Sequence, residues 1–346
     1  MQNYFKDILE FERYSFAEDI EYSNKSSITV SRKPVLADDD FVFCKDGDDI
    51  VYVGICDNYN SGSDTSEYEI KMLQKENLFN RSIFVESEQL IADAGIEDFI
   101  VEAIRNNFTA SGDELMDKAF MNAYAETHTP VAAKVDADQG VFNLKTYLGN
   151  AKQYYGIFID FVFAGKTLSV RVYKKEMDTI PIDIEVSDVT DYKETYEVSE
   201  LARLLVNWKM PDSQDESGYT IVGATSRRNF FLLANRTITE DINDADRAAG
   251  MSKSVLIEAE TEAEMLQKVY NEFKSNRYNH KISFYLNRTS KLYPEEKFFV
   301  GRKTMIKTKS GVRESMITKA EVTSESAMKN LTFGNLKTTL IEKLTG

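Results

Sequence analysis

Two distant parts of this chain repeat one pattern of segments. In residues 28–43 a short alternating segment runs into Arg32 and Pro34, a group of aspartates and an apolar run. In residues 282–300 an alternating segment leads to Arg288 and Pro294, a pair of glutamates and again an apolar run. More alternating segments follow, at 49–55 and 315–322. Side chains of a strand point alternately to two faces, so this alternation predicts strands. The pattern predicts two copies of one small β-barrel, and the alternative is that two ordinary β-hairpins look alike.

The net charge of −15 is distributed unevenly along the chain. Residues 1–100 hold 9 basic and 22 acidic side chains, a balance of −13, whereas residues 281–346 hold 13 and 6, a balance of +7. The acidic total argues against a nucleic-acid-binding protein, which needs a basic surface to meet phosphates. If both ends fold as barrels, their opposite signs favour packing side by side. The alternative is that both sets of charges are solvated faces.

Composition excludes further classes. No apolar run approaches the roughly 18–20 residues of a membrane span, and the N-terminus shows no signal peptide, so we expect synthesis in the cytoplasm. The two cysteines, Cys44 and Cys56, lie in alternating segments and are expected to be free, buried thiols.

The periodicity divides the chain into a multidomain α+β protein. We expect a first β-barrel domain at 1–88 and a small α+β domain at 89–176, with helices at 96–108, 115–123 and 144–155 and a hairpin at 156–173. A second β-barrel domain is expected at 177–210 and 280–346, with a short helix at 336–344. Between its two parts lies an inserted segment, 211–279, with strands and a helix that begins at a capping box, Thr261 to Glu264.

A search for catalytic and cofactor motifs finds no candidate residue. His128 and His280 have no second ligand at metal-binding spacing and no nucleophile nearby, so we expect structural or surface roles. Residues 165–167 (GKT) resemble the end of a phosphate-binding loop, but Asp160 stands where that motif needs glycine. We therefore expect no cofactor.

Acidic clusters give no better candidate. Residues 38–40 (DDD) and 46–49 (DGDD) do not complete a calcium loop. Glu295 and Glu296 are adjacent, so in a strand they point to opposite faces and do not form a glycosidase pair. Most of the 39 Phe and Tyr residues alternate within strands, as in a β-barrel core, and Trp208 is the single tryptophan. We expect no catalytic, cofactor-binding or metal-binding residue and no enzymatic activity.

Several segments together carry a family resemblance: 143–148 (NLKTYL), 155–161 (YGIFIDF), 228–241 (RNFFLLANRTITED), 300–302 (VGR), 312–319 (VRESMITK) and 331–336 (LTFGNL). They resemble baseplate hub, or tail-associated (Tal-type), tail-tip proteins of siphophages and prophages of Gram-positive bacteria. The resemblance covers most of the chain, and its motifs are structural. Many relatives carry a C-terminal peptidase or fibre-like extension, whereas this sequence ends at Gly346 after the second barrel pattern, so we expect no hydrolase domain.

The resemblance implies a virion structural protein. A homotrimeric baseplate hub would close the distal end of the tail tube, and its two barrels per chain would adapt three-fold to six-fold symmetry. Implied partners are further copies of the chain, the distal tail protein ring, other tail-tip proteins and a fibre or lysin protein, with DNA passing through the channel without specific binding. The implied location is the virion tail tip. Two alternatives remain, a cell-wall-degrading hydrolase and a host glycan-binding module.

Overall fold

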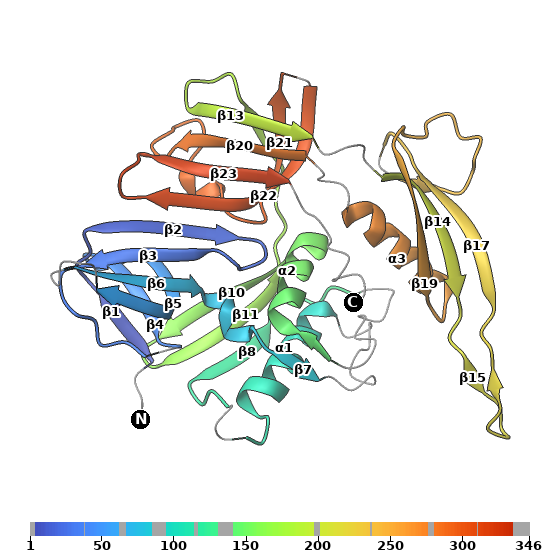
Figure 1. Ribbon diagram of the computed structural model, residues 1–346, viewed down its shortest axis with the longest axis horizontal. Helices are drawn as coiled ribbons and strands as arrows, with labels where there is room; N and C mark the ends of the chain where they lie inside the picture. The colour runs from blue at the N-terminus through green and yellow to red at the C-terminus, as the bar shows by residue number, and fades with distance from the viewer. Residues whose placement is uncertain are drawn as a thin grey trace.

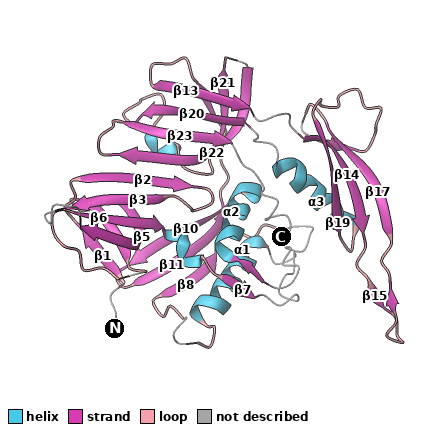
Figure 2. Ribbon diagram, in the orientation of Figure 1, coloured by secondary structure: helices cyan, strands magenta, loops and turns pink. Residues whose placement is uncertain are grey.

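The protein consists mainly of strands, which form two modules at the ends of the chain, a central α+β region and an inserted domain. The computed structural model describes residues 4–37, 39–61, 67–84, 95–113, 117–130, 141–196, 201–235, 237–275, 280–309 and 311–334. Helices α1 and α2 lie beside the central sheet, and α3 lies in the inserted domain (Figure 2). The predicted helix at 336–344 and Asp38 fall outside the described residues.

The first module, here called the N-module, has six strands. They are β1 (Phe5–Ile8), β2 (Arg13–Asp19), β3 (Lys25–Val30), β4 (Phe41–Asp46), β5 (Asp49–Ser61) and β6 (Tyr68–Gln74). Their order in the sheet is β1-β4-β5-β6-β3-β2, with β1 parallel to β4 and the other neighbours antiparallel. Gly47, in the left-handed region at φ 61°, supplies the tight turn between β4 and β5. A 3₁₀ turn, η1 (Lys75–Phe79), follows β6.

The second module, the C-module, repeats this arrangement strand for strand. Its strands are β12 (Ile180–Asp183), β13 (Val189–Tyr196), β20 (His280–Asn287), β21 (Lys303–Thr308), β22 (Gly311–Thr323) and β23 (Met328–Gly334), with η5 (Glu295–Lys297) before β21. Their order is β12-β21-β22-β23-β20-β13, again with one parallel pair, β12 with β21, and antiparallel pairs elsewhere. In each module the second strand along the chain, β2 or β13, is the last in the strand order. The fifth strand, β5 or β22, has 13 residues in both modules.

The modules are not closed barrels. In the described residues neither path of strands returns to its first strand, and β2 pairs instead with β22, so both modules share one twelve-stranded sheet (Figure 1). The prediction of duplicated β-modules is therefore supported by identical topology, whereas the prediction of two closed barrels is wrong for the described residues. The pairing of β2 with β22 satisfies backbone donors and acceptors at the strand edges, which in a closed barrel would pair within the same module.

The central region joins the modules. The antiparallel hairpin β10 (Ile157–Ala164) and β11 (Thr167–Lys174) turns at Gly165, and β8 (Met121–Ala125) runs parallel to β11. Residues 115–123, expected to be helical, thus include strand β8, because the edge of β11 offers backbone partners that outweigh the helical spacing. Helix α1 (Ile96–Ile104) continues as a π-turn, η4 (Arg105–Thr109), and β7 (Ser82–Phe84) pairs with β9 (Val141–Asn143).

Helix α2 (Leu144–Tyr155) has the predicted start. The Asn143 side chain accepts a hydrogen bond from the Thr146 N–H at 3.2 Å, and Gly156 ends the helix in the left-handed conformation. Its buried face joins the apolar core shared by the central region and the N-module. The helix packs so closely that a Cβ at Gly149 would lie 2.9 Å from the Ile20 carbonyl oxygen.

The inserted domain is a four-stranded sheet with one helix. Its elements are β14 (Leu201–Lys209), β17 (Thr225–Leu232), β18 (Ile238–Thr239), β19 (Met251–Glu258) and α3 (Glu262–Ser275), and a small ladder of β15 (Ser213–Gln214) and β16 (Thr220–Ile221) extends from it. Residues 201–209, expected in the second barrel, therefore belong to the insertion, because β14 pairs with β17 and β19. The Thr261 hydroxyl accepts the Glu264 N–H at 3.2 Å, as the capping box predicts.

Candidate assembly interface

The junction between the two modules, here called the seam, is a stretch of antiparallel sheet. Residues 15–19 of β2 lie opposite residues 323–319 of β22, so that Ala17 faces Glu321 and Asp19 faces Lys319. On the same edge of β22, residues 311–316 pair with β21. The long strand therefore holds two partners on one edge, the hairpin partner along its first half and the other module along its second half.

Side chains add few contacts to this backbone ladder. The Ser15 hydroxyl donates to Glu321 at 3.4 Å, and the Tyr14 N–H donates to the Ser324 hydroxyl at 3.2 Å. The Arg288 guanidinium donates to the Tyr14 hydroxyl at 3.3 Å and to both Glu295 oxygens at 3.1 Å. The hydrogen bond with Tyr14 is the main cause that raises the pKa of Arg288 above its ordinary value. These contacts make the seam a β-sheet interface with a polar margin.

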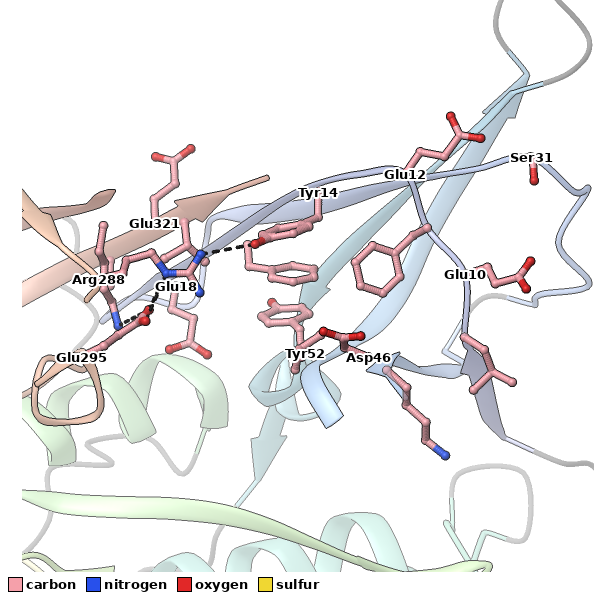
Figure 3. A pocket seen from close by; sticks show the side chains of 18 residues that line it. Glu10, Glu12, Tyr14, Glu18, Ser31, Asp46, Tyr52, Arg288, Glu295 and Glu321 are labelled. Carbon is pink, nitrogen blue, oxygen red and sulfur yellow. Dashed lines mark hydrogen bonds and ion pairs between the residues drawn. The ribbon is translucent and has the colours of Figure 1, made fainter. Parts of the chain in front are cut away.

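A pocket of about 770 Å³ opens beside the seam. Residues of both modules line it, and Figure 3 shows Tyr14 and Tyr52 among them. Phe16 stacks between these two rings. The ring centroids lie 4.7 Å apart for Tyr14 and Phe16 and 4.5 Å apart for Phe16 and Tyr52. A hydrogen bond holds the Tyr52 end of the stack in place, because the Ser26 hydroxyl donates to the Tyr52 hydroxyl at 2.9 Å.

The lining of this pocket is acidic. Six carboxylates and three basic side chains line it: Glu10, Glu12, Glu18, Asp46, Glu295 and Glu321 with Lys45, Arg288 and Lys329. Burial lowers the pKa of Lys329 despite the nearby carboxylate of Glu295. Its 18 lining residues include no histidine and no cysteine. The pocket thus offers an aromatic surface with carboxylates around it, and no nucleophile paired with a histidine base.

The residues singled out in the sequence lie apart from one another. The Nδ1 of exposed His128 lies 2.6 Å from an Asp98 carboxylate oxygen, and the Nε2 of buried His280 lies 2.8 Å from the Ser315 hydroxyl in the C-module. Glu295 binds Arg288, and Trp208 donates to the Ala259 carbonyl at 2.9 Å in the inserted domain. Gly165 is the turn of a β-hairpin, as expected, and not a phosphate-binding loop.

The cysteines are free and buried, as predicted. Burial raises the pKa of the Cys44 thiol to about 12, so it is protonated at neutral pH. Among the described residues no group of three or more His, Cys, Asp or Glu side chains is arranged to hold a metal ion. No helix in the described part of the chain is both long and apolar enough to cross a membrane.

The sequence predicted the two modules and their packing side by side, but not the strand pairing that forms the seam. The signal that points to the seam is the length of residues 311–323. This strand has 13 residues and its hairpin partner has six, so the hairpin leaves about half of one edge of the long strand for another strand. Which strand fills that half depends on contacts between residues 306 positions apart, such as Ser15 and Glu321.

The fold is that of phage tail proteins. The chain is similar to the 43-kDa tail protein of prophage MuSo2 from Shewanella oneidensis (TM-score 0.55, 10% identity, 94% of each chain). It is similar to a tail protein from Neisseria meningitidis MC58 (0.56, 10%, 94% of this chain and 92% of that one). A third similar structure is prophage tail protein gp18 from Listeria monocytogenes EGD-e (0.52, 8%, 96% and 90%). No protein-family model matches the sequence, and no curated protein matches it.

Proposed function

We propose that three copies of this chain form a ring at the distal end of a phage or prophage tail. The proposed role is structural and needs no catalytic group. Each chain would contribute two equivalent modules, so that a three-fold hub presents six similar surfaces to a six-fold ring of the tail tube. The observation that carries this proposal is the strand-for-strand identity of the two modules and their edge-to-edge pairing in one sheet. The shared fold with prophage tail proteins supports the location.

The two faces of the shared sheet support a channel. One face carries the apolar cores of the modules. Near the seam the opposite face carries six uncharged polar residues, Ser15, Ser27, Thr29, Ser283, Asn330 and Thr332, together with the charged Lys319 and Glu321. None of the six is fully buried. In the proposed ring this polar face borders the channel, because a water-filled channel requires a hydrated wall and the apolar faces already pack within the modules.

Mass measurement tests the ring directly. Native mass spectrometry should give a species of three times the 39.5-kDa chain mass, and electron microscopy should show a three-fold particle with a central hole. A chain that stays monomeric at every concentration would contradict the proposal.

A charge reversal tests the contact with the tail. Lys303 and Lys309 are exposed on the basic C-module. Lys303→Glu with Lys309→Glu should lower incorporation into tails, since like charges now meet at an interface selected by charge. The matched control reverses Lys166 and Lys174 on the central hairpin and should leave incorporation unchanged. Release of sugar reducing ends from purified Gram-positive cell walls would contradict the non-catalytic role.

A further inference from the structure

The inserted domain has a pocket of its own, on the face of its sheet that α3 does not cover. Phe230 and Leu232 of β17 belong to the core beneath α3, so Phe231 between them points to the opposite face. Figure 1 shows α3 between this sheet and the central region, so the opposite face points away from the central region. A pocket of about 320 Å³ lies on that face, and Phe231, which is 4% exposed, is part of its lining. This ring is therefore buried outside the apolar core of its domain.

Two arginines from different segments cover this ring. Arg203 of β14 lies opposite Phe231 in the antiparallel ladder. Arg247 forms a single β-bridge with Leu233, two residues beyond Phe231. Both side chains therefore share the face of Phe231. The guanidinium carbons of Arg203 and Arg247 lie 5.7 Å and 5.1 Å from the centroid of the Phe231 ring, within the range of cation–π contacts.

Neither guanidinium has a carboxylate partner in the part of the chain that the structure describes. Arg203 donates a hydrogen bond to the Asn229 side-chain oxygen at 3.0 Å. Arg247 donates a hydrogen bond to the Asp244 carbonyl oxygen, also at 3.0 Å. These two bonds fix the direction of each side chain, and a guanidinium has five N–H donors in all. Most donors of both arginines therefore remain for a ligand.

The pocket lining is basic in an acidic protein. The chain has 57 acidic and 42 basic side chains, yet the eight lining residues include both arginines and no acidic residue. Two aspartates near Arg247 in the chain bind their own loop, since Asp241 accepts the Asn243 N–H at 2.8 Å and Asp244 accepts the Asp246 N–H at 2.9 Å. Two guanidinium charges close together repel each other, and a bound anion replaces this repulsion with attraction.

We infer that this pocket binds the phosphate group of a phosphate monoester. The planar fork of a guanidinium matches two oxygens of a phosphate. A phosphate monoester carries a charge of about −1.5 to −2 at pH 7, which two arginines balance. A carboxylate or a phosphodiester carries a single negative charge and balances one of them. Ile242, which is 56% exposed in the lining, offers an apolar surface to the rest of the ester.

This site goes beyond the structural role proposed above. All of its residues lie in the inserted domain, away from the seam and from the two modules. The inference therefore does not depend on the ring, and the mass measurement that tests the ring leaves it unaffected.

Calorimetric titration of the full chain tests the site. Phenyl phosphate, a monoester with an apolar body, should bind saturably, and inorganic phosphate should bind more weakly because it has no group to place against Ile242. Arg203→Gln and Arg247→Gln should each lower the affinity for phenyl phosphate at least about ten-fold, since each removes a charge-assisted pair. Arg203→Lys and Arg247→Lys keep the charge but lose the fork, so their affinities should lie between those of the wild type and the Gln variants. Thermal unfolding without ligand shows which variants keep the fold.

A matched control removes a charge from the same face of the same sheet. Arg227 lies opposite Asn207, which is four residues along β14 from Arg203, roughly 13 Å away. Arg227 does not line the pocket, so Arg227→Gln should bind phenyl phosphate as the wild type does. An equal loss in Arg227→Gln and in the pocket variants would show attraction to a basic face and would overturn the site.

The choice of anion separates the chemical classes. Acetate and dimethyl phosphate, which carry one negative charge each, should bind much more weakly than phenyl phosphate. Equal affinity for dimethyl phosphate would assign the pocket to phosphodiesters, and equal affinity for acetate would assign it to carboxylates, and either result would reject the monoester. No saturable binding of phenyl phosphate to the wild-type chain would overturn the inference outright.

Discussion

The two modules share a topology but fill their interiors differently. In the C-module, residues 288–302 connect β20 to β21, and Tyr293, Phe298 and Val300 of this connection are buried in the core. The Tyr293 hydroxyl also accepts the Asp183 N–H at 2.8 Å. In the corresponding connection of the N-module, residues 31–40, Pro34 is buried and Leu36 is partly buried, while Val35 is 86% exposed. The pocket beside the seam opens on this less filled module.

The difference shows which parts of a duplicated fold are fixed. Strand order depends on backbone pairing and on the length of six strands, and both modules keep it. The filling of the interior depends on one connecting segment, which is free to differ because it takes no part in the ladder. We therefore expect the modules to respond differently to equivalent substitutions.

The largest expected effect comes from truncating the connection in the C-module. Phe298 is 1% exposed, so Phe298→Ala should lower the free energy of unfolding by about 3–5 kcal/mol. Leu36→Ala should cost much less, about 1 kcal/mol, because Leu36 is only partly buried and little new cavity forms. Urea unfolding followed by fluorescence measures both. Equal losses of unfolding free energy for Phe298→Ala and Leu36→Ala would contradict the expected difference in how the two modules fill their interiors.

A smaller effect is expected at one equivalent position on the long strands. Gly54 of β5 pairs with Val42, and Ser315 of β22 pairs with Thr304 at the same place in the repeat. A Cβ at Gly54 would lie 2.8 Å from the Met72 Cβ, so Gly54→Ala should overpack the N-module by about 1–3 kcal/mol. Ser315→Ala makes the opposite change, because it removes the hydroxyl that lies 2.8 Å from the Nε2 of buried His280, at a cost of about 1–3 kcal/mol.

The expected mechanisms of these two variants can be told apart. Gly54→Ala should be rescued in part in a Met72→Gly background, since the clash is steric and the clashing atom is the Met72 Cβ, which only glycine lacks. Ser315→Thr should keep most of the stability that Ser315→Ala loses, since the hydroxyl remains. No rescue in the first case would show that overpacking is not the cause.

The smallest expected effect concerns a pair of equivalent lysines. Lys307 of β21 lies 2.7 Å from Asp183, and Lys45 of β4 lies 2.9 Å from Asp7. The hydrogen bond from Lys307 holds the pKa of Asp183 below its ordinary value. A carboxyl with a lowered folded-state pKa stabilises the fold above its unfolded pKa, and this contribution is lost as the pH falls through the lowered value. Lys307→Met should raise the Asp183 pKa in an NMR titration, while Lys45→Met should leave it unchanged.

The sequence by itself determined the duplication. Alternation at 28–30 and 282–286, and the capping residues Asn143 and Thr261, are local signals, and local signals set strands and helix starts. The same signals gave a wrong prediction within residues 115–123. The apolar residues there have helical spacing, but the segment includes strand β8, which pairs with β11. The signals also failed at residues 201–209, whose alternation is equally compatible with either neighbouring sheet.

Only the tertiary structure decided how the modules meet. The sequence of a strand shows which of its faces is apolar. It does not show which other strand pairs with its edges, because the backbone donors and acceptors are nearly the same at every residue. The pairing of β2 with β22 therefore emerged only when residues 15–19 and 319–323 came together in space.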